Sequence, residues 1–278
     1  MSETKTAVLP TFFYGTAWKE ERTEALVDMA IDAGFRAIDT ANQRKHYHEA
    51  GVGAALKKAF DGGQLSRGDL FLQTKFTFRG GQDDRLPYDP DAPIGDQVKQ
   101  SFESSLAHLG VEQLDSLVLH GPSRRDGLGP ADEQAWRAME SIQQSGRVGR
   151  LGVSNVSDEQ LGAFLELAEV QPTFVQNRCY ARKGWDAAVR RRCDEAGLVY
   201  QGFSLLTANR DALSSDDAKA IAERHDVTVP QLVFAFARAL GMIPLTGTTD
   251  REHMRKDLAA LDLTLEDSEV RTLESLAV

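Results

Sequence analysis

Apolar positions along this chain follow two patterns that alternate. Short runs rich in β-branched and aromatic residues are separated by longer stretches whose apolar residues return every three to four positions. The short runs predict eight strands, at Phe12–Gly15, Ala37–Asp39, Leu70–Lys75, Ser116–His120, Val148–Ser154, Phe174–Asn177, Leu198–Phe203 and Met242–Leu245. The longer stretches predict ten helices, at Glu21–Ala33, Glu49–Phe60, Asp96–Leu109, Ala131–Ser145, Asp158–Glu169, Asp186–Ala196, Asp216–Arg224, Gln231–Leu240, Arg251–Ala260 and Glu266–Leu276. Because parallel neighbours need helical crossovers, this alternation predicts a parallel sheet.

Polar residues mark the carboxyl ends of six of the predicted strands. They are Asp39, Lys75, His120, Asn155, Gln176 and Ser204. In a β/α barrel such strand ends converge on one mouth, whereas an open doubly wound sheet spreads them along an edge. The sequence therefore predicts an α/β fold of the (β/α)8 TIM-barrel type, as a single domain over residues 1–278. The last helical pattern reaches the end of the chain, so we expect no long C-terminal loop.

Composition and charge limit the possible partners. The chain has 278 residues, of which 41% are hydrophobic and 27% charged, and its formal net charge is −10. These values are typical of a folded protein and argue against nucleic acid or an anionic membrane as a partner. The polar N-terminus lacks the apolar core of a signal peptide, and no long uncharged apolar run predicts a membrane span. Two cysteines are too few for a disulfide framework, so we expect a cytoplasmic protein.

Four titratable residues form a candidate acid–base set. Asp39 and Lys75 end buried strands, where a structural ion pair alone would explain them, but His120 brings a third such group to the same mouth. Tyr47 follows the second strand and would be the proton donor. We expect the Lys75 ammonium to lower the pKa of this phenol, Asp39 to hold Lys75, and a neutral His120 to bind a carbonyl oxygen. Such a set suits protonation of the alkoxide formed by hydride transfer to a carbonyl.

Five segments in register resemble the aldo-keto reductase superfamily. They are Gly34–Ala41, Gln73–Lys75, Leu114–His120, Gly149–Asn155 and the stretch from Ile243 to Arg255. The resemblance implies a β/α barrel that binds NADPH or NADH across its mouth and reduces aldehydes or ketones. It also places Asp39, Lys75 and His120 at the family's catalytic positions.

The tyrosine motif departs from the family pattern. The family has D-T-A-x-x-Y, but Arg44 stands five positions after Asp39 and Tyr47 stands eight after it. An insertion of three residues within Asn42–His46 restores the alignment and leaves Tyr47 as the expected donor. The alternatives are an inactive site or a site that uses His46 or His48.

The same region offers His46, His48 and Glu49 as possible metal ligands. No H-E-x-x-H motif or second ligand cluster accompanies them. We therefore expect no metal site.

The family resemblance also implies the cofactor contacts. Ser154, Asn155 and Gln176 would hold the nicotinamide carboxamide, and Phe203 would stack on the ring. The remaining expected contacts are Thr16, Ala17, Asp39, Ser204, Leu206, Thr246, Gly247, Thr248, His253 and Asp257. Leu245 and His253 stand where many NADPH-dependent members carry lysine and arginine, although Arg251 and Arg255 could compensate. NADPH is the expected cofactor, and NADH stays open.

The expected function is NAD(P)H-dependent reduction of a small-molecule carbonyl substrate by a monomer or weak homo-oligomer. Trp18, Tyr47 and His120 would contact the substrate, and the walls would come from the loop after Lys75 and the segment around His46. One alternative is a catalytically weak or inactive nucleotide-binding regulatory or interaction protein on the same barrel. Another is an isomerase or lyase that uses Lys75 as a Schiff-base nucleophile, which the neighbouring Asp39 opposes because a paired lysine stays protonated.

Overall fold

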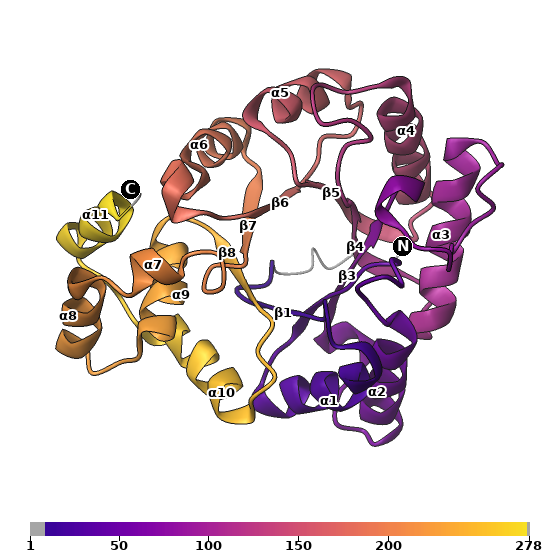
Figure 1. The fold of residues 1–278 in the computed structure, drawn as a ribbon. Coiled ribbons are helices and arrows are strands. Elements are labelled where there is room, and N and C mark those ends of the chain that lie inside the picture. The colour runs from indigo at the N-terminus through magenta and orange to yellow at the C-terminus, as the bar shows by residue number, and fades with distance from the viewer. Residues whose placement is uncertain (1–8, 277–278) are drawn as a thin grey trace, which may run out of the picture.

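Eight parallel strands form a closed barrel in the computed structural model, which describes residues 9–276 (Figure 1). The strands follow one another in chain order, and β8 pairs with β1 to close the barrel. Their bounds are β1 Phe13–Gly15, β2 Ala37–Asp39, β3 Phe71–Phe76, β4 Leu114–Leu119, β5 Val148–Ser154, β6 Phe174–Arg178, β7 Val199–Phe203 and β8 Ile243–Thr246. This order confirms the predicted (β/α)8 architecture and excludes the open doubly wound sheet.

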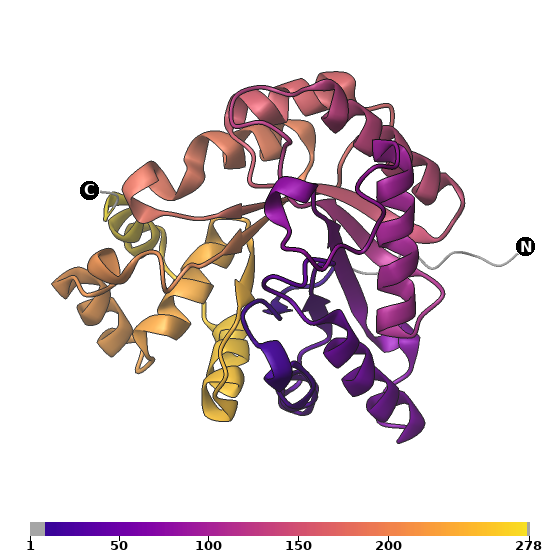
Figure 2. The same ribbon diagram turned by 45° about the vertical axis from the view of Figure 1, so that its right-hand side comes forward.

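The helices form a ring outside the strands (Figures 1 and 2). They are α1 Thr23–Ala33, α2 Glu49–Asp61, α3 Ile94–Leu109, α4 Pro130–Gln144, α5 Asp158–Leu167, α6 Ala187–Ala196, α7 Arg210–Leu213, α8 Asp216–Arg224, α9 Val229–Ala239, α10 Arg251–Ala259 and α11 Asp267–Ser275. All ten predicted helices are confirmed, with ends that differ by a few residues. The sequence did not predict α7, because a helix of four residues is too short to show a 3.6-residue period.

Two expectations concern segments outside the described residues. The polar N-terminus, from which we predict no export signal, lies in residues 1–8, and the expectation of no long C-terminal loop concerns the chain end at residues 277–278. Within residues 9–276, the helices are too short or too polar for any of them to traverse a bilayer.

Alternating side chains fill the barrel interior in layers. The first residues of several strands form an apolar plug, which includes Phe13, Phe71, Phe174 and Ile243. The third residues of five strands form a polar layer directly above it, made of Asp39, Gln73, Ser116, Gln176 and Gln201. Side chains of a strand alternate between its two faces, so first and third residues point the same way. The barrel is therefore closed at its amino end and polar toward its mouth.

Hydrogen bonds tie the polar layer together. The Gln73 amide donates to Asp39 Oδ1 at 2.8 Å and to Gln201 Oε1 at 2.8 Å, and Ser116 Oγ donates to Gln73 Oε1 at 2.9 Å. Gln176 Nε2 also donates to Gln201 Oε1, at 2.9 Å. Buried amides are tolerated when their polar atoms are paired, and these bonds fix each side chain relative to the others. The layer thus forms a rigid base beneath the mouth.

Gly53 allows α2 to approach α3 closely. A Cβ atom at this position would lie 1.9 Å from the His108 carbonyl oxygen and 3.1 Å from Leu109 Cα. We expect Gly53→Ala to lower the free energy of unfolding by about 2–3 kcal/mol, because backbone must move to admit the methyl group. Gly80→Ala is the matched control, since a Cβ there has nothing within 4 Å, and it should change stability by less than about 0.5 kcal/mol. Urea unfolding measures both, and equal effects would contradict this view of the α2–α3 contact.

Candidate active site

A cavity of about 910 Å³ opens at the carboxyl ends of the strands. Its wall includes Asp39, Tyr47, His120, Asn155 and Gln176, which come from or follow four different strands. The barrel therefore brings the predicted strand-end residues together at one mouth. The loop after β3 and the segment around His46 also contribute, as the sequence predicts.

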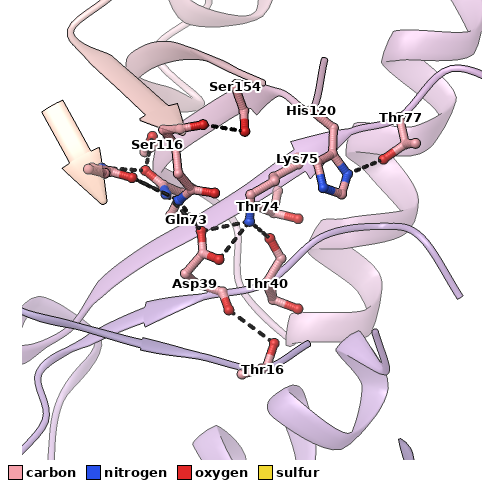
Figure 3. A network of polar contacts seen from close by, with 12 residues as sticks. Thr16, Asp39, Thr40, Gln73, Thr74, Lys75, Thr77, Ser116, His120 and Ser154 are labelled. Carbon is pink, nitrogen blue, oxygen red and sulfur yellow. Dashed lines mark hydrogen bonds and ion pairs between the residues drawn. The ribbon is translucent and has the colours of Figure 1, made fainter. Parts of the chain in front are cut away.

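Lys75 and Asp39 form a buried ion pair at the base of this cavity (Figure 3). Lys75 Nζ donates to both carboxylate oxygens of Asp39 at 2.7 Å and to the Thr40 carbonyl at 2.8 Å. The two side chains are only 1% and 4% exposed. Burial lowers the pKa of Lys75, and the Asp39 charge and hydrogen bond oppose that shift. The lysine thus has three acceptors for its three ammonium hydrogens.

Tyr47 stands beside this pair despite the inserted residues before it. The Gln43 carbonyl accepts from the N–H groups of His46 at 3.0 Å and Tyr47 at 2.9 Å, which closes the insertion into a compact turn. The Tyr47 ring centroid lies 5.3 Å from Lys75 Nζ and 5.9 Å from the His120 ring centroid. The insertion therefore returns the tyrosine to the cavity. Among the described residues, its hydroxyl has no hydrogen-bond partner.

The prediction that Lys75 lowers the pKa of Tyr47 is wrong. Burial raises the pKa of Tyr47, and the Asp39 carboxylate raises it further. The main physical reason is burial, which disfavours the charged phenolate, and the ammonium charge of Lys75 is paired with Asp39. Tyr47 is therefore a protonated phenol over the whole physiological pH range.

His120 is an uncharged imidazole. Burial, together with the charges of Lys75 and His46, lowers its pKa to about 3. Its Nδ1 atom lies 2.7 Å from the Thr77 hydroxyl, which the sequence did not single out (Figure 3). Nε2 has no hydrogen-bond partner within the part of the chain that the structure describes. One ring nitrogen is thus fixed by protein and the other is available to a ligand.

The amide groups expected at the nicotinamide retain free acceptors. Asn155 Nδ2 donates to the His120 carbonyl at 2.7 Å, and Gln176 Nε2 donates to Asp39 Oδ1 at 3.0 Å. Ser154 Oγ donates to the Gln176 carbonyl at 2.6 Å. The side-chain oxygens of Asn155 and Gln176 make no hydrogen bond within residues 9–276, so both can accept from a carboxamide N–H. This donor and acceptor set fits a nicotinamide.

The wall continues toward the other expected cofactor contacts. Ala17, Phe203, Ser204, Leu206, Thr246, Gly247 and Thr248 all line the cavity. Arg178 also lines it, with its guanidinium carbon 5.5 Å from the Phe203 ring centroid, a contact that was not predicted from the sequence.

Three expected cofactor contacts lie outside the cavity wall. Thr16 Oγ1 donates to the Asp39 carbonyl at 3.0 Å, beneath the wall. Asp257 is buried and accepts from Thr246 Oγ1 at 2.7 Å, and burial raises its pKa to about 6. His253 lies in the first turn of α10, where its N–H donates to the capping Asp250 carboxylate at 2.9 Å.

Lys19 is a buried cation that the sequence reasoning did not identify. It is 6% exposed, lines the cavity, and donates from Nζ to the Gly247 carbonyl next to β8. Burial and the nearby Arg22 charge lower its pKa to about 8. It lies on the β1 loop directly after Trp18, where no strand or helix periodicity distinguishes it.

Each of the three possible metal ligands contacts a different residue. Nδ1 of His46 lies 2.8 Å from Gln43 Oε1, and Nδ1 of His48 lies 3.3 Å from the Glu20 carbonyl. Glu49 is buried and accepts a hydrogen bond from Thr74. Their proximity in sequence therefore does not produce a shared site.

Comparisons with known proteins agree with this fold. The model of the Aldo/keto reductase family matches residues 11–278. An uncharacterized oxidoreductase of Bacillus subtilis, YtbE, is 26% identical over 271 residues, covering 96% of this chain and 89% of the relative. The NADPH-dependent alpha-keto amide reductase of Saccharomyces cerevisiae is 25% identical, covering 91% and 82%. A solved aldo-keto reductase complexed with NADPH superimposes with a TM-score of 0.81 at 22% identity, covering 96% and 84%. This chain therefore belongs to the aldo/keto reductase family.

Proposed function

We propose that this protein is an NADPH-dependent oxidoreductase that reduces aldehydes or ketones to alcohols, with Tyr47 as the proton donor. One observation carries the proposal: a single cavity is lined by Asp39, a protonated Tyr47 and a neutral His120 beside free amide acceptors, and Lys75 is paired with Asp39 beneath it. The yeast relative that is named as NADPH-dependent, and the solved structure with NADPH, support the choice of cofactor.

The residues that would hold the cofactor lie along the β5 to β8 side of the cavity and on the β1 loop. Asn155 Oδ1 and Gln176 Oε1 accept from the carboxamide, and Phe203 offers an aromatic face. Leu245 stands where many NADPH-dependent members of the family carry lysine, and Lys19 offers a positive charge from the β1 loop instead. When bound, NADPH supplies a hydride to the carbonyl carbon. Because Lys19 has no carboxylate partner among the described residues, its charge is available to a phosphate.

His120 orients the carbonyl oxygen. Nδ1 lies 2.7 Å from the Thr77 hydroxyl, and we assign the hydroxyl as the donor in this contact, which leaves the single proton of the neutral imidazole on Nε2. Nε2–H then donates to the oxygen and stabilises the negative charge that develops on it. Burial disfavours a charged imidazole at this position, so the neutral form of His120 takes this role.

Tyr47 completes the reaction by protonating that oxygen. An alkoxide is a stronger base than phenolate, so the proton moves from Tyr47 to the product even though burial raises the pKa of the phenol. The Lys75 ammonium, 5.3 Å from the ring centroid, stabilises the phenolate that remains. Asp39 keeps Lys75 charged and in place.

The two alternative functions make different demands on these residues. A Schiff-base nucleophile must lose its proton, but Lys75 donates three hydrogen bonds to Asp39 and Thr40. A regulatory nucleotide-binding protein would keep cofactor affinity without turnover, and the Tyr47 variant separates it from an enzyme.

Replacing Tyr47 by phenylalanine removes the proton donor and leaves the ring in place. We expect kcat/KM for 4-nitrobenzaldehyde to fall by about 10²–10⁴-fold, while NADPH affinity stays within about threefold. His48→Asn is the control for a donor from the same segment, and it should retain turnover because His48 contacts the Glu20 carbonyl instead of the cavity. NADPH oxidation rates and fluorescence titrations measure these effects. Unchanged turnover in Tyr47→Phe would overturn the donor assignment.

The charge of Lys19 predicts a pH-dependent affinity for NADPH. Its pKa is lowered to about 8, so the cation is present below that pH and is lost above it. We expect the Kd of the wild-type protein to rise about fivefold between pH 7 and pH 9, because most of the lysine loses its proton over this range and the neutral form binds about tenfold more weakly.

Two variants isolate this effect. Lys19→Met should bind NADPH about tenfold more weakly at pH 7 and lose the pH dependence. Lys19→Arg should keep its charge and show a flat profile. A wild-type slope that persists in Lys19→Met would show that another group is responsible.

A further inference from the structure

His46 lies in the inserted segment and lines the same cavity as His120. The proposed proton and hydride transfers do not use it. It is close enough to His120 for its charge to lower the pKa of that residue. The cavity is therefore lined by two imidazoles, one from the end of β4 and one from the segment before Tyr47.

Hydrogen bonds around Gln43 determine which nitrogen of His46 carries the proton. Gln43 Nε2 donates to the Gly81 carbonyl at 2.6 Å, so the amide atom 2.8 Å from His46 Nδ1 is the oxygen Oε1. A carbonyl oxygen only accepts, and Nδ1 must therefore carry the hydrogen. Burial and Lys45 lower the pKa of His46 more than Asp83 raises it, which favours the neutral ring. Nε2 then holds a lone pair.

The surroundings fix the position of this ring. The Trp18 ring centroid lies 3.9 Å from the His46 ring centroid, and the backbone N–H of Trp18 donates to the His46 carbonyl at 2.7 Å. The absence of a side chain at Gly81 lets Thr77 pack closely beside this contact, since a Cβ there would lie 2.7 Å from Thr77 Cγ2. Nε2 of His46 has no hydrogen-bond partner among residues 9–276. It is thus a preorganised acceptor with no protein donor.

The two imidazoles have opposite hydrogen-bonding polarity toward the cavity. In the proposed function, on which this inference rests, Nε2–H of His120 donates to the reacting carbonyl oxygen. We propose that Nε2 of His46 accepts a hydrogen bond from a hydroxyl group elsewhere on the same substrate. His46 thereby selects hydroxylated carbonyl compounds over analogues that lack a donor. An analogue without a donor binds more weakly, because it displaces the water that hydrogen-bonds to Nε2 and offers no hydrogen bond in return.

A matched pair of aldehydes tests this selection. The probes are 3-hydroxybenzaldehyde, which has a donor, and 3-methoxybenzaldehyde, which has only an acceptor at the same position and a similar electronic effect on the carbonyl. We expect the wild-type protein to favour the hydroxy aldehyde in kcat/KM, and His46→Phe to reduce the ratio of the two values about five- to tenfold. The ratio cancels any general loss of activity, which a purely structural role would cause for both substrates.

Two conservative variants locate the effect at one nitrogen. His46→Asn places its amide near the position of Nδ1 and should behave like His46→Phe. His46→Gln places its amide near the position of Nε2 and should recover much of the ratio. The same wild-type ratio in His46→Phe, or no recovery in His46→Gln beyond that in His46→Asn, would overturn the proposal.

Calorimetry of the two aldehydes with the full chain separates this inference from the proposed function. If the wild-type protein reduces neither aldehyde, the proposed function fails. The affinity ratio in the wild-type protein and in His46→Phe then still tests the hydrogen bond directly. Equal ratios would overturn the inference, and a loss of preference in the variant would support it.

Discussion

The buried contact between Lys75 and Asp39 determines how the mouth of this barrel is built. Breaking such a pair leaves an uncompensated charge in the interior and costs about 3–5 kcal/mol, so the surrounding structure must keep both partners together. The amides of Gln73 and Gln176 converge on Asp39 Oδ1, and the Thr40 carbonyl takes the third ammonium hydrogen. These bonds link the ion pair to the polar layer of the barrel, and that layer rests on the apolar plug at its amino end. Beside this pair, burial and then the Asp39 carboxylate raise the pKa of the Tyr47 phenol, which therefore keeps its proton.

Around this pair, hydrogen-bond partners decide what each side chain can offer a ligand. The Thr77 hydroxyl holds one nitrogen of His120, and the Gln43 amide holds one nitrogen of His46. Each ring thus keeps a single nitrogen without a protein partner among residues 9–276. Lys19 reaches the Gly247 carbonyl from the β1 loop and brings a positive charge to the β8 side, where the chain has Leu245. The segment before Tyr47 therefore adds a polar residue, His46, to the cavity that Tyr47 also lines.

Periodicity predicted the eight strands and ten of the helices because alternating and 3.6-residue patterns are local properties of the chain. The convergence of Asp39, Lys75 and His120 followed from topology, since parallel strands in a barrel all end at one mouth. The direction of the pKa shift of Tyr47 could not be predicted, because it depends on how deeply the fold buries the phenol and how close Asp39 lies to it. Lys19 was overlooked for a similar reason: its partner is 228 residues away in sequence, and no local pattern links it to Gly247.

Isotope labelling tests whether hydride is transferred directly from NADPH to the carbonyl carbon of the substrate. In this mechanism the residues at the barrel mouth supply only the proton. The wild-type protein would reduce 4-nitrobenzaldehyde with NADPH that carries two deuterium atoms at C4, and mass spectrometry would locate the label. Direct hydride transfer predicts one deuterium on the carbinol carbon, and none on carbon when unlabelled NADPH is used in D2O. An unlabelled alcohol in the first reaction, or carbon-bound deuterium in the second, would contradict it.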